Sequence, residues 1–307
     1  MKYDLVIIGG GPAGITAGIY AARKKMKTLI VSKDFLGQAG RAAFVENWPG
    51  IKKTSGPELM TSFKEHLSGY EIDFLENELI SSLSKQEDVF NLITNQKKEI
   101  STKAIIVASG KNPRPLKVPG EEEFLGKGVV YCSICDGPLF ANKTISVIGC
   151  GNSGFETAIE MAEKYSAKVY LLEASMKIMA DEYLQEKALE TGKIEIIKGA
   201  LLREIKGNQF VESIKYFDSL EKQEKEIKVD GVFVEIGSVP AAEFLGDLVE
   251  CNEKGEIKVD HRTCSTKTQG VFAAGDVTDI RDKQIITASA EGAKAALSAY
   301  YYLNGQN

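Results

Sequence analysis

The chain has 307 residues, a formal net charge of -5 and a sequence pI near 5.4. This length suffices for two domains of ordinary size, and the hydrophobic (43%) and charged (26%) fractions are those of a globular protein. No basic cluster and no membrane-length apolar run occurs, so neither nucleic acid nor a membrane is an expected partner. Five cysteines, an odd number, do not indicate a secreted disulfide scaffold, and we expect a cytoplasmic protein.

The first predicted elements form a strand–turn–helix–strand unit. Residues 2–8 predict a short apolar strand that runs directly into the glycine-rich turn 9–14. A helix follows to about residue 25, and residues 28–32 predict a second strand. The unit is typical of a dinucleotide-binding βαβ motif.

The next segment is less regular until the same unit recurs. Residues 57–68 predict an amphipathic helix, and residues 71–107 predict a small sheet. A strand at 145–148, a glycine turn at 149–154 and a helix at 155–164 then repeat the first unit. Two nucleotide-binding domains follow from this repeat more naturally than one large domain.

The last predicted elements are a strand that ends in an acidic turn at 270–276 and a helix from about 287 to 303. If they close the first sheet, the second domain is inserted in the first. The sequence thus predicts an α/β protein with two Rossmann-like, three-layer ββα domains. The expected boundaries are residues 1–116 with 243–307, and residues 117–242.

Both glycine turns have the GxGxxG spacing. In this motif the first glycine makes the tight turn, the second lets the backbone approach a pyrophosphate, and the third permits close helix–strand packing. The pyrophosphate lies at the helix N-terminus, where free N–H groups and the helix dipole favour an anion. A tight structural turn is the alternative for either copy. The motif glycines are Gly9, Gly11 and Gly14, and Gly149, Gly151 and Gly154.

Glu173 ends the strand that follows the second motif. A carboxylate there can accept hydrogen bonds from both adenosine ribose hydroxyls and repels a 2′-phosphate. Lys177 is the only nearby cation, and no arginine occurs between Glu173 and Arg203. The second site is therefore expected to bind NADH rather than NADPH, unless Glu173 is only a solvated strand end. The first motif has no acid at the matching position, although Asp34 lies two residues further on.

Cys132 and Cys135 form a CxxC motif followed by Asp136. This spacing suits a reducible disulfide whose thiolate is stabilised by the local dipole. Half of a zinc site, or two incidental buried thiols, are the alternatives, but zinc needs a second pair and none is present, so no metal is expected. Asp136 could protonate the leaving thiolate if burial raises its pKa, or it could simply cap a helix.

The whole chain closely resembles the low-molecular-weight thioredoxin reductases. The motifs that carry the resemblance are residues 9–14 (GGGPAG), 46–50 (ENWPG), 108–110 (ASG), 132–137 (CSICDG), 149–154 (GCGNSG) and 275–276 (GD). The resemblance implies FAD in the discontinuous domain and NAD(P)H in the inserted domain. It also implies that Cys135 faces the flavin, that Cys132 exchanges with a protein disulfide, that Asp136 donates a proton, and that the enzyme is a homodimer.

The resemblance also implies which residues bind the cofactors. The residues expected at the flavin are Gly9, Gly11, Pro12, Ala13, Gly14, Gln38, Asn47, Ala108, Gly110, Asp276, Gln284 and Ile285. Those expected at the nicotinamide nucleotide are Gly149, Gly151, Asn152, Ser153, Gly154 and Glu173.

The segment that begins at Glu173 departs from the basic cluster of NADPH-using reductases. It is similar instead to the flavoprotein component of NADH-dependent alkyl hydroperoxide reductase. That component has an additional N-terminal thioredoxin-like domain, so we expect the thiol partner here to be a separate protein. The predicted function is electron transfer from NADH through FAD and the Cys132–Cys135 disulfide to thioredoxin or a similar small protein.

Three other functions stay open at this stage. The receiver could be a glutaredoxin-like carrier that feeds a peroxiredoxin. The electron donor could be ferredoxin, although the intact second glycine motif argues against it. The chain could also be a redox-sensing flavoprotein without turnover, which predicts flavin reduction but no disulfide reductase activity.

Overall fold

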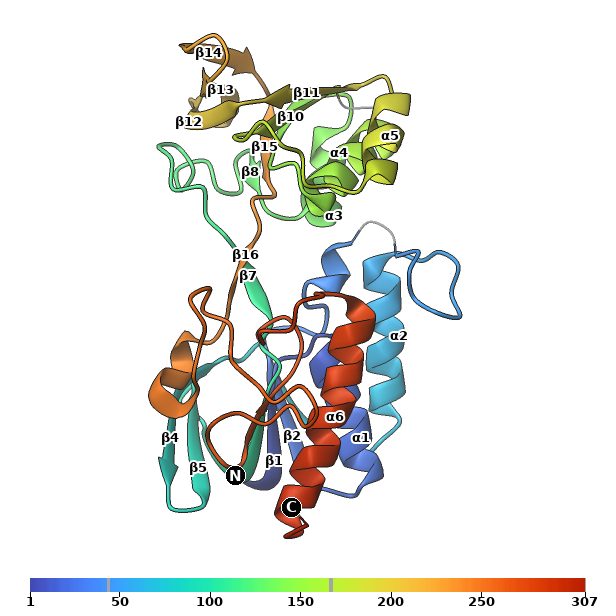
Figure 1. The fold of residues 1–307 in the computed structure, drawn as a ribbon, viewed down its shortest axis with the longest axis vertical. Coiled ribbons are helices and arrows are strands. Elements are labelled where there is room, and N and C mark those ends of the chain that lie inside the picture. The colour runs from blue at the N-terminus through green and yellow to red at the C-terminus, as the bar shows by residue number, and fades with distance from the viewer. Residues whose placement is uncertain (43–44, 166–167, 307) are drawn as a thin grey trace. The chain divides into compact units, whose positions relative to one another are not determined.

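The structure is a computed structural model that describes residues 1–42, 45–165 and 168–306, without the side chains of residues 134 and 135. The chain divides into two compact units (Figure 1). The first comprises Met1–Asn112 with Val239–Asn307, and the second comprises Pro113–Ser238. Both junctions fall a few residues before the expected boundaries, within the paired strands β7 (Lys111–Pro113) and β16 (Ser238–Pro240).

The first unit contains a seven-stranded mixed sheet in the order β3-β2-β1-β6-β5-β4, with β17 paired to β6. Strands β3, β2, β1, β6 and β17 are parallel, whereas β5 and β4 are antiparallel. The strands are β1 (Lys2–Ile8), β2 (Thr28–Ser32), β3 (Asp73–Glu76), β4 (Ile80–Gln86), β5 (Val89–Thr94), β6 (Glu99–Val107) and β17 (Val271–Ala273).

Three long helices of the first unit lie together on one face of this sheet (Figure 1). Helix α1 contacts both α2 and α6. The helices are α1 (Pro12–Arg23), α2 (Gly56–Ser68) and α6 (Ile285–Leu303), and the short 3-10 helices are η1 (Ala39–Arg41) and η3 (Glu243–Leu248). Among the described residues, no helix is both long and apolar enough to cross a membrane.

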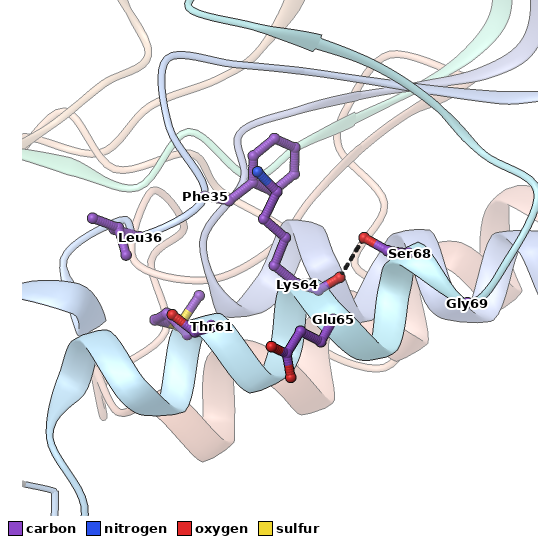
Figure 2. Close-up of a pocket in the computed structure, with 8 residues that line it drawn as sticks. Phe35, Leu36, Thr61, Lys64, Glu65, Ser68 and Gly69 are labelled. Atoms are coloured by element: carbon purple, nitrogen blue, oxygen red, sulfur yellow. Dashed lines mark hydrogen bonds between the residues drawn. The ribbon is translucent and has the colours of Figure 1, made fainter.

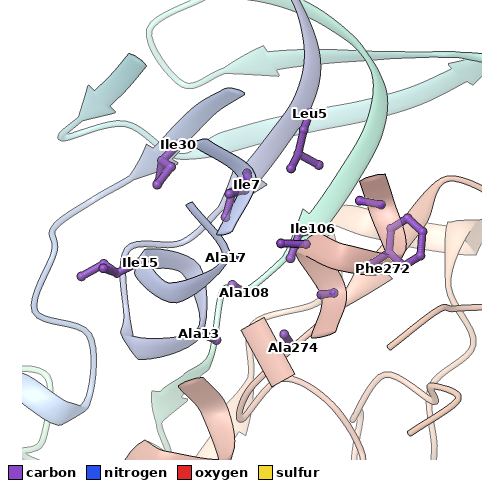
Figure 3. Packing of buried hydrophobic residues seen from close by; sticks show 14 of the residues in the cluster. Leu5, Ile7, Ala13, Ile15, Ala17, Ile30, Ile106, Ala108, Phe272 and Ala274 are labelled. Carbon is purple, nitrogen blue, oxygen red and sulfur yellow. The ribbon is translucent and has the colours of Figure 1, made fainter. Parts of the chain in front are cut away.

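Strand β1 is apolar throughout because both faces of its sheet are covered. Leu5 and Ile7 pack into the cluster on the helix side (Figure 3), whereas Val6 and Ile8 pack into a second cluster on the opposite side. All four side chains are buried, and each contributes about 1.5–3 kcal/mol of hydrophobic free energy. This packing fixes the end of β1, and hence the position of the glycine loop that follows it.

The second unit repeats this plan around a parallel five-stranded sheet in the order β11-β10-β9-β15-β8. Its strands are β8 (Val129–Val130), β9 (Thr144–Ile148), β10 (Lys168–Glu173), β11 (Ile194–Lys198) and β15 (Gly231–Val234). The antiparallel sheet comprises β12 (Ala200–Gly207), β13 (Val211–Asp218) and β14 (Gln223–Lys228). The helices are α3 (Ser133–Asp136), η2 (Gly137–Phe140), α4 (Asn152–Lys164) and α5 (Glu182–Glu190).

The parallel sheet of the second unit is also covered on both faces. Val147 packs into a cluster with residues of α4 and α5, whereas Ile148 packs into a cluster with residues of the antiparallel sheet. The unit therefore has three layers, with the antiparallel sheet as the third.

Candidate functional site

The first glycine loop joins β1 to α1 and has a backbone that only small residues permit. Gly9 has φ +115°, and a β-carbon on it would lie 2.2 Å from the carbonyl oxygen of Ala108. A β-carbon on Gly14 would lie 1.9 Å from the carbonyl oxygen of Gly9. By contrast, no described atom approaches the β-carbon position of Gly11 closer than 4.0 Å. The first and third glycines thus serve packing, and the second leaves open space.

Helix α1 begins in this open space. Gly11 is its N-cap, Pro12 is in its first turn, and no described side chain caps the first N–H groups. Uncapped N–H groups at a helix N-terminus attract anions. The loop therefore fits the pyrophosphate of a dinucleotide such as FAD.

Hydrogen bonds join several of the expected flavin-site residues to distant segments. The Gln38 side chain donates to the backbone carbonyl oxygen of Lys111 (2.8 Å), and the Asn47 side chain donates to Oε1 of Gln284 (3.0 Å). Gln284 is the N-cap of α6, and Ile285 is the first residue of that helix. Segments from across the first unit are therefore bonded to one another, and one of these bonds reaches the start of α6.

Asp276 follows β17 in a half-buried turn. Burial raises the pKa of its carboxyl, while Lys283 and Lys111 oppose the shift. Gly110, at the end of the expected 108–110 motif, has φ +66° and no described atom within 4 Å of its β-carbon position. Open backbone at Gly110 and a carboxyl at Asp276 are features that suit a bound nucleotide.

Asp34 is already engaged within its own loop. Its Oδ1 accepts hydrogen bonds from the N–H groups of Leu36 (3.0 Å) and Gly37 (2.9 Å). The side chain of Ser32, which ends β2, donates to the carbonyl oxygen of Asp34. In the described structure Asp34 therefore stabilises the turn after β2, a role that the sequence does not distinguish from ribose binding.

The second glycine loop joins β9 to α4 and has the same geometry. Gly149 has φ +111°, and its β-carbon would lie 2.3 Å from the carbonyl oxygen of Glu235. The β-carbon of Gly154 would lie 1.9 Å from the carbonyl oxygen of Gly149, whereas Gly151 has no described atom within 4 Å. Gly151 is the N-cap of α4, again without a side-chain cap from any described residue. The loop fits a second pyrophosphate.

Glu173, the last residue of β10, contacts this second loop directly. Its Oε2 accepts from the backbone N–H of Cys150 (3.1 Å), and its Oε1 accepts from that of Ser175 (2.8 Å). These two bonds hold the carboxylate in one orientation beside the glycine loop. A fixed carboxylate at this place is what ribose recognition requires.

The segment after Glu173 is tied to the same loop at two further points. The backbone N–H of Met179 donates to the carbonyl oxygen of Cys150 (3.3 Å). The Asn152 side chain donates to the Asp181 carboxylate (3.0 Å) and accepts from the Asp181 backbone N–H (2.9 Å). The Ser153 side chain is exposed at the start of α4.

The redox motif lies at α3, directly before η2. Cys132 is disulfide-bonded, and the side chain of Cys135 lies outside the described residues. Burial raises the pKa of the half-buried Asp136 carboxyl. A raised pKa keeps the acid protonated at higher pH, so Asp136 can serve as a proton donor.

Ser133, between the two cysteines, makes a contact that sequence reasoning missed. Its buried hydroxyl donates to Oε2 of the buried Glu160 on α4 (2.8 Å). This bond connects the redox motif to the helix that begins at the second glycine loop. The sequence signal for it was an acidic residue at an apolar position of α4.

The remaining cysteines and acidic residues give no sign of a metal centre in the described part of the chain. Cys150, Cys251 and Cys264 carry free thiols. Within the described ranges, no group of three or more His, Cys, Asp or Glu side chains is arranged to hold a metal ion.

A groove of about 580 Å³ lies between α2 and the loop after β2 (Figure 2). Lys64 of α2 extends over the ring of Phe35, with Nζ 4.9 Å from the ring centroid, and also pairs with Glu76 (2.7 Å). The Phe35 ring in turn limits the space at Gly10, whose β-carbon would lie 3.0 Å from it. The groove adjoins the first glycine loop, but none of the described residues that line it is an expected site residue.

The sequence matches one protein family over nearly its whole length. Residues 3–292 match the family described as pyridine nucleotide-disulphide oxidoreductase. The chain is 42% identical over 301 residues to the NADH dehydrogenase of Bacillus subtilis (strain 168), covering 98% of this chain and 58% of that protein. It is 40% identical over 301 residues to an alkyl hydroperoxide reductase component, its F subunit, of Staphylococcus aureus (strain NCTC 8325 / PS 47), covering 98% and 59%. The chain thus spans less than two thirds of these relatives.

Solved structures of similar length have the same fold. The thioredoxin reductase of Lactococcus lactis superposes with a TM-score of 0.93 at 37% identity, covering 99% of this chain and 100% of that one. The T. acidophilum thioredoxin reductase gives 0.91 at 38% identity, covering 97% and 98%. These likenesses confirm the predicted α/β fold and the predicted resemblance to thioredoxin reductases. The chain belongs to the pyridine nucleotide-disulphide oxidoreductase family.

Proposed function

We propose that this chain is a flavin-dependent disulfide reductase that uses NADH to reduce a small dithiol protein through Cys132 and Cys135. The observation that carries the proposal is the pair of matching glycine loops in one chain with a disulfide-bonded Cys132. Each loop has open space at its second glycine and a helix N-terminus that no described side chain caps. Family membership and the two thioredoxin reductase structures support the same chemistry.

FAD is the group proposed for the first loop, and when bound it would supply the hydride acceptor between nicotinamide and disulfide. The N–H groups at the start of α1 would hold its pyrophosphate, and Asp276 would bind next to it. Gln38, Asn47, Gln284 and Ile285 would line the rest of the site. The second loop and Glu173 would bind the pyrophosphate and adenosine ribose of NADH.

The protein's own residues would complete the thiol chemistry. In the reduced state, a Cys132 thiolate attacks one sulfur of the partner disulfide, and the partner's other sulfur leaves as a thiolate. Cys135 then attacks the mixed disulfide, which restores the Cys132–Cys135 bond and releases the second partner thiolate. Asp136, whose pKa burial raises, would protonate a leaving thiolate. The partner leaves with two thiols, so two electrons and two protons are transferred.

The preference for NADH over NADPH rests on Glu173. Its carboxylate is fixed by two backbone N–H groups, so it would accept from the ribose hydroxyls and repel a 2′-phosphate. The test is kcat/KM for NADH and NADPH on one preparation, with a thioredoxin as the acceptor. We expect NADH to be preferred, and a tenfold or greater preference for NADPH would contradict the role of Glu173.

The electron path is tested separately with Cys135→Ser. This variant should retain flavin reduction by NADH and lose all thioredoxin reduction, because no disulfide can form with Cys132. Thioredoxin reduction that survives in the variant would refute the path. A redox sensor without turnover would instead show flavin reduction and no thioredoxin reduction already in the unmodified enzyme.

A second receiver is a glutaredoxin-like or peroxiredoxin system. It is favoured by the 40% identity to a protein named as a component of alkyl hydroperoxide reductase. Parallel assays with a thioredoxin and with a glutaredoxin-like protein coupled to a peroxiredoxin distinguish the two. The proposal also includes a homodimer and a cytoplasmic location, where the free thiols of the chain would stay reduced.

A further inference from the structure

Glu291 of α6 is a buried carboxylic acid that the proposed chemistry does not use. Its side chain is 2% exposed, in a helix whose other buried residues are alanine, serine and glycine. Burial raises the pKa of its carboxyl. An apolar residue would avoid the cost of burying a carboxyl group, so this acid needs a reason for its position.

The hydrogen bonds of the Glu291 carboxyl in the described structure all lead to one turn. Its Oε2 accepts a hydrogen bond of 2.7 Å from the backbone N–H of Gly275, and the Thr278 hydroxyl lies 3.5 Å from the same oxygen. The Thr278 hydroxyl also donates to the carbonyl oxygen of Gly275 (2.8 Å). Asp276, the acid proposed to bind FAD, lies between these two residues. The carboxyl of Glu291 therefore holds both ends of the turn that presents Asp276.

The same stretch of α6 also touches the first glycine loop. A β-carbon on Gly292 would lie 2.1 Å from the carbonyl oxygen of Ala13, so α6 and the start of α1 are in backbone contact. A β-carbon on Gly275 would lie 3.1 Å from the β-carbon of Ala13 and 3.5 Å from that of Ala288. The turn, the N-terminus of α1 and the middle of α6 thus meet with no space to spare.

We infer that Glu291 is a positioning residue for FAD, which fixes the Gly275–Thr278 turn against α6 and thereby sets Asp276 relative to the N-terminus of α1. The inference rests on the proposed flavin site. It predicts that the hydrogen bond to Gly275 matters and that the negative charge does not. One oxygen of the carboxyl, Oε1, has no hydrogen-bond partner among the described residues, so an amide group can replace it.

The test compares two near-isosteric variants of Glu291 by titrating the apoprotein with FAD and following flavin fluorescence. Glu291→Gln retains an acceptor for the Gly275 N–H, and its Kd for FAD should stay within about threefold of the wild-type value. Glu291→Met fills the same volume without an acceptor and leaves the N–H unpaired, so its Kd should rise about tenfold or more. The flavin absorption spectrum, which responds to the polarity around the ring, provides a second readout.

Glu78 provides the matched control. It is another buried acid of the first unit, 1% exposed and with one unpartnered oxygen among the described residues. Its side chain pairs with Lys98 rather than with the Asp276 turn. Glu78→Met should lower the Tm as Glu291→Met does, yet leave the Kd for FAD unchanged. If both Met variants weaken FAD equally, Glu291 acts only through stability and the inference is wrong.

Other outcomes also decide the question. Equal FAD affinity of Glu291→Met and the wild type, or equal weakening by Gln and Met, overturns the positioning role. If Glu291→Met does not fold, Thr278→Val removes the hydroxyl at the other end of the turn and should raise the Kd about threefold, and an unchanged Kd refutes the inference. A wild-type chain that binds no FAD overturns the proposed function as well, whereas FAD binding without turnover overturns the proposed function alone.

Discussion

The strand after the first glycine loop ends in Ser32, whereas the strand after the second ends in Glu173. The loops themselves have nearly the same backbone, with φ +115° at Gly9 and +111° at Gly149 and the same close approach at the third glycine. At the first loop the nearest acid, Asp34, is bonded to its own turn, whereas at the second the carboxylate is bonded to the loop. The glycine spacing thus specifies a place for a pyrophosphate, and the residue that ends the next strand distinguishes one nucleotide from another.

The largest effects are expected from the third glycines. In Gly14→Ala and Gly154→Ala the new β-carbon would lie 1.9 Å from a carbonyl oxygen, so the loop must distort at a cost of about 3 kcal/mol or more. Gly14→Ala should lose FAD, whereas Gly154→Ala should retain FAD and lose NADH. Thermal unfolding and titration with each nucleotide measure this, and a Gly154→Ala variant with normal Tm and NADH affinity would contradict it.

The second glycines should separate binding from stability. Gly11 and Gly151 have φ −79° and −85°, which alanine adopts readily, and no described atom lies closer than 4.0 Å to either β-carbon position. Alanine at either position should change the free energy of unfolding by less than about 0.5 kcal/mol. It should weaken FAD (Gly11) or NADH (Gly151) about tenfold or more, because a methyl group occupies the place of the pyrophosphate. A loss of stability equal to that of the third-glycine variants would refute the distinction.

Glu173→Gln tests the group that differs between the two loops. The amide keeps the shape and loses the charge that repels a 2′-phosphate, so the ratio of kcat/KM for NADH to that for NADPH should fall about three- to tenfold. Glu195→Gln is the control, because Glu195 is an exposed carboxylate on the neighbouring strand β11. An equal change in both variants would mean that net charge, rather than the ribose contact, sets the preference.

A smaller difference concerns the helices that follow the loops. Five residues after the second glycine, α1 has Thr16 whereas α4 has Glu156. Burial, with Glu235 and Asp181 nearby, raises the pKa of Glu156 to about 7. Because the folded pKa lies above the unfolded one, the protonated form stabilises the fold below about pH 4.5, and this contribution is lost as pH rises through about 7.

Glu156→Gln should therefore be more stable than the wild type at pH 8, by about 1 kcal/mol, and the difference should vanish near pH 4. Denaturant unfolding at several pH values measures the effect. Glu163, an exposed acid on the same helix, gives the matched Gln control. A stability difference that stays constant from pH 4 to pH 8 would rule out titration of Glu156.

The sequence predicts the glycine loops well because the residue types and their spacing directly encode the backbone. Helix starts are less predictable. Helix α4 begins at Asn152 rather than at residue 155, and α6 begins at Ile285 rather than at residue 287. The first turn of a helix that faces a nucleotide has no apolar periodicity, so pattern reasoning places its start too late.

Contacts between distant residues are the part that sequence reasoning could not supply. Ser133 bonds Glu160, and Glu291 bonds Gly275, in each case across many residues of chain. Each of these glutamates lies in a helix where solvent exposure is the ordinary expectation for an acid. Only the packing around each helix reveals that both are buried and paired.

The cysteines outside the redox motif have a consequence for chemical labelling. Burial raises the pKa of both Cys150 and Cys264 to about 12, and burial also raises the pKa of the exposed Cys251. Since only a thiolate attacks disulfides or alkylating reagents, these sulfurs are poor competitors at neutral pH. A catalyst that handles disulfides is thereby protected from cross-linking to its own substrate at the wrong sulfur. Brief alkylation after mild reduction should accordingly report on the redox motif, with little background from the rest of the chain.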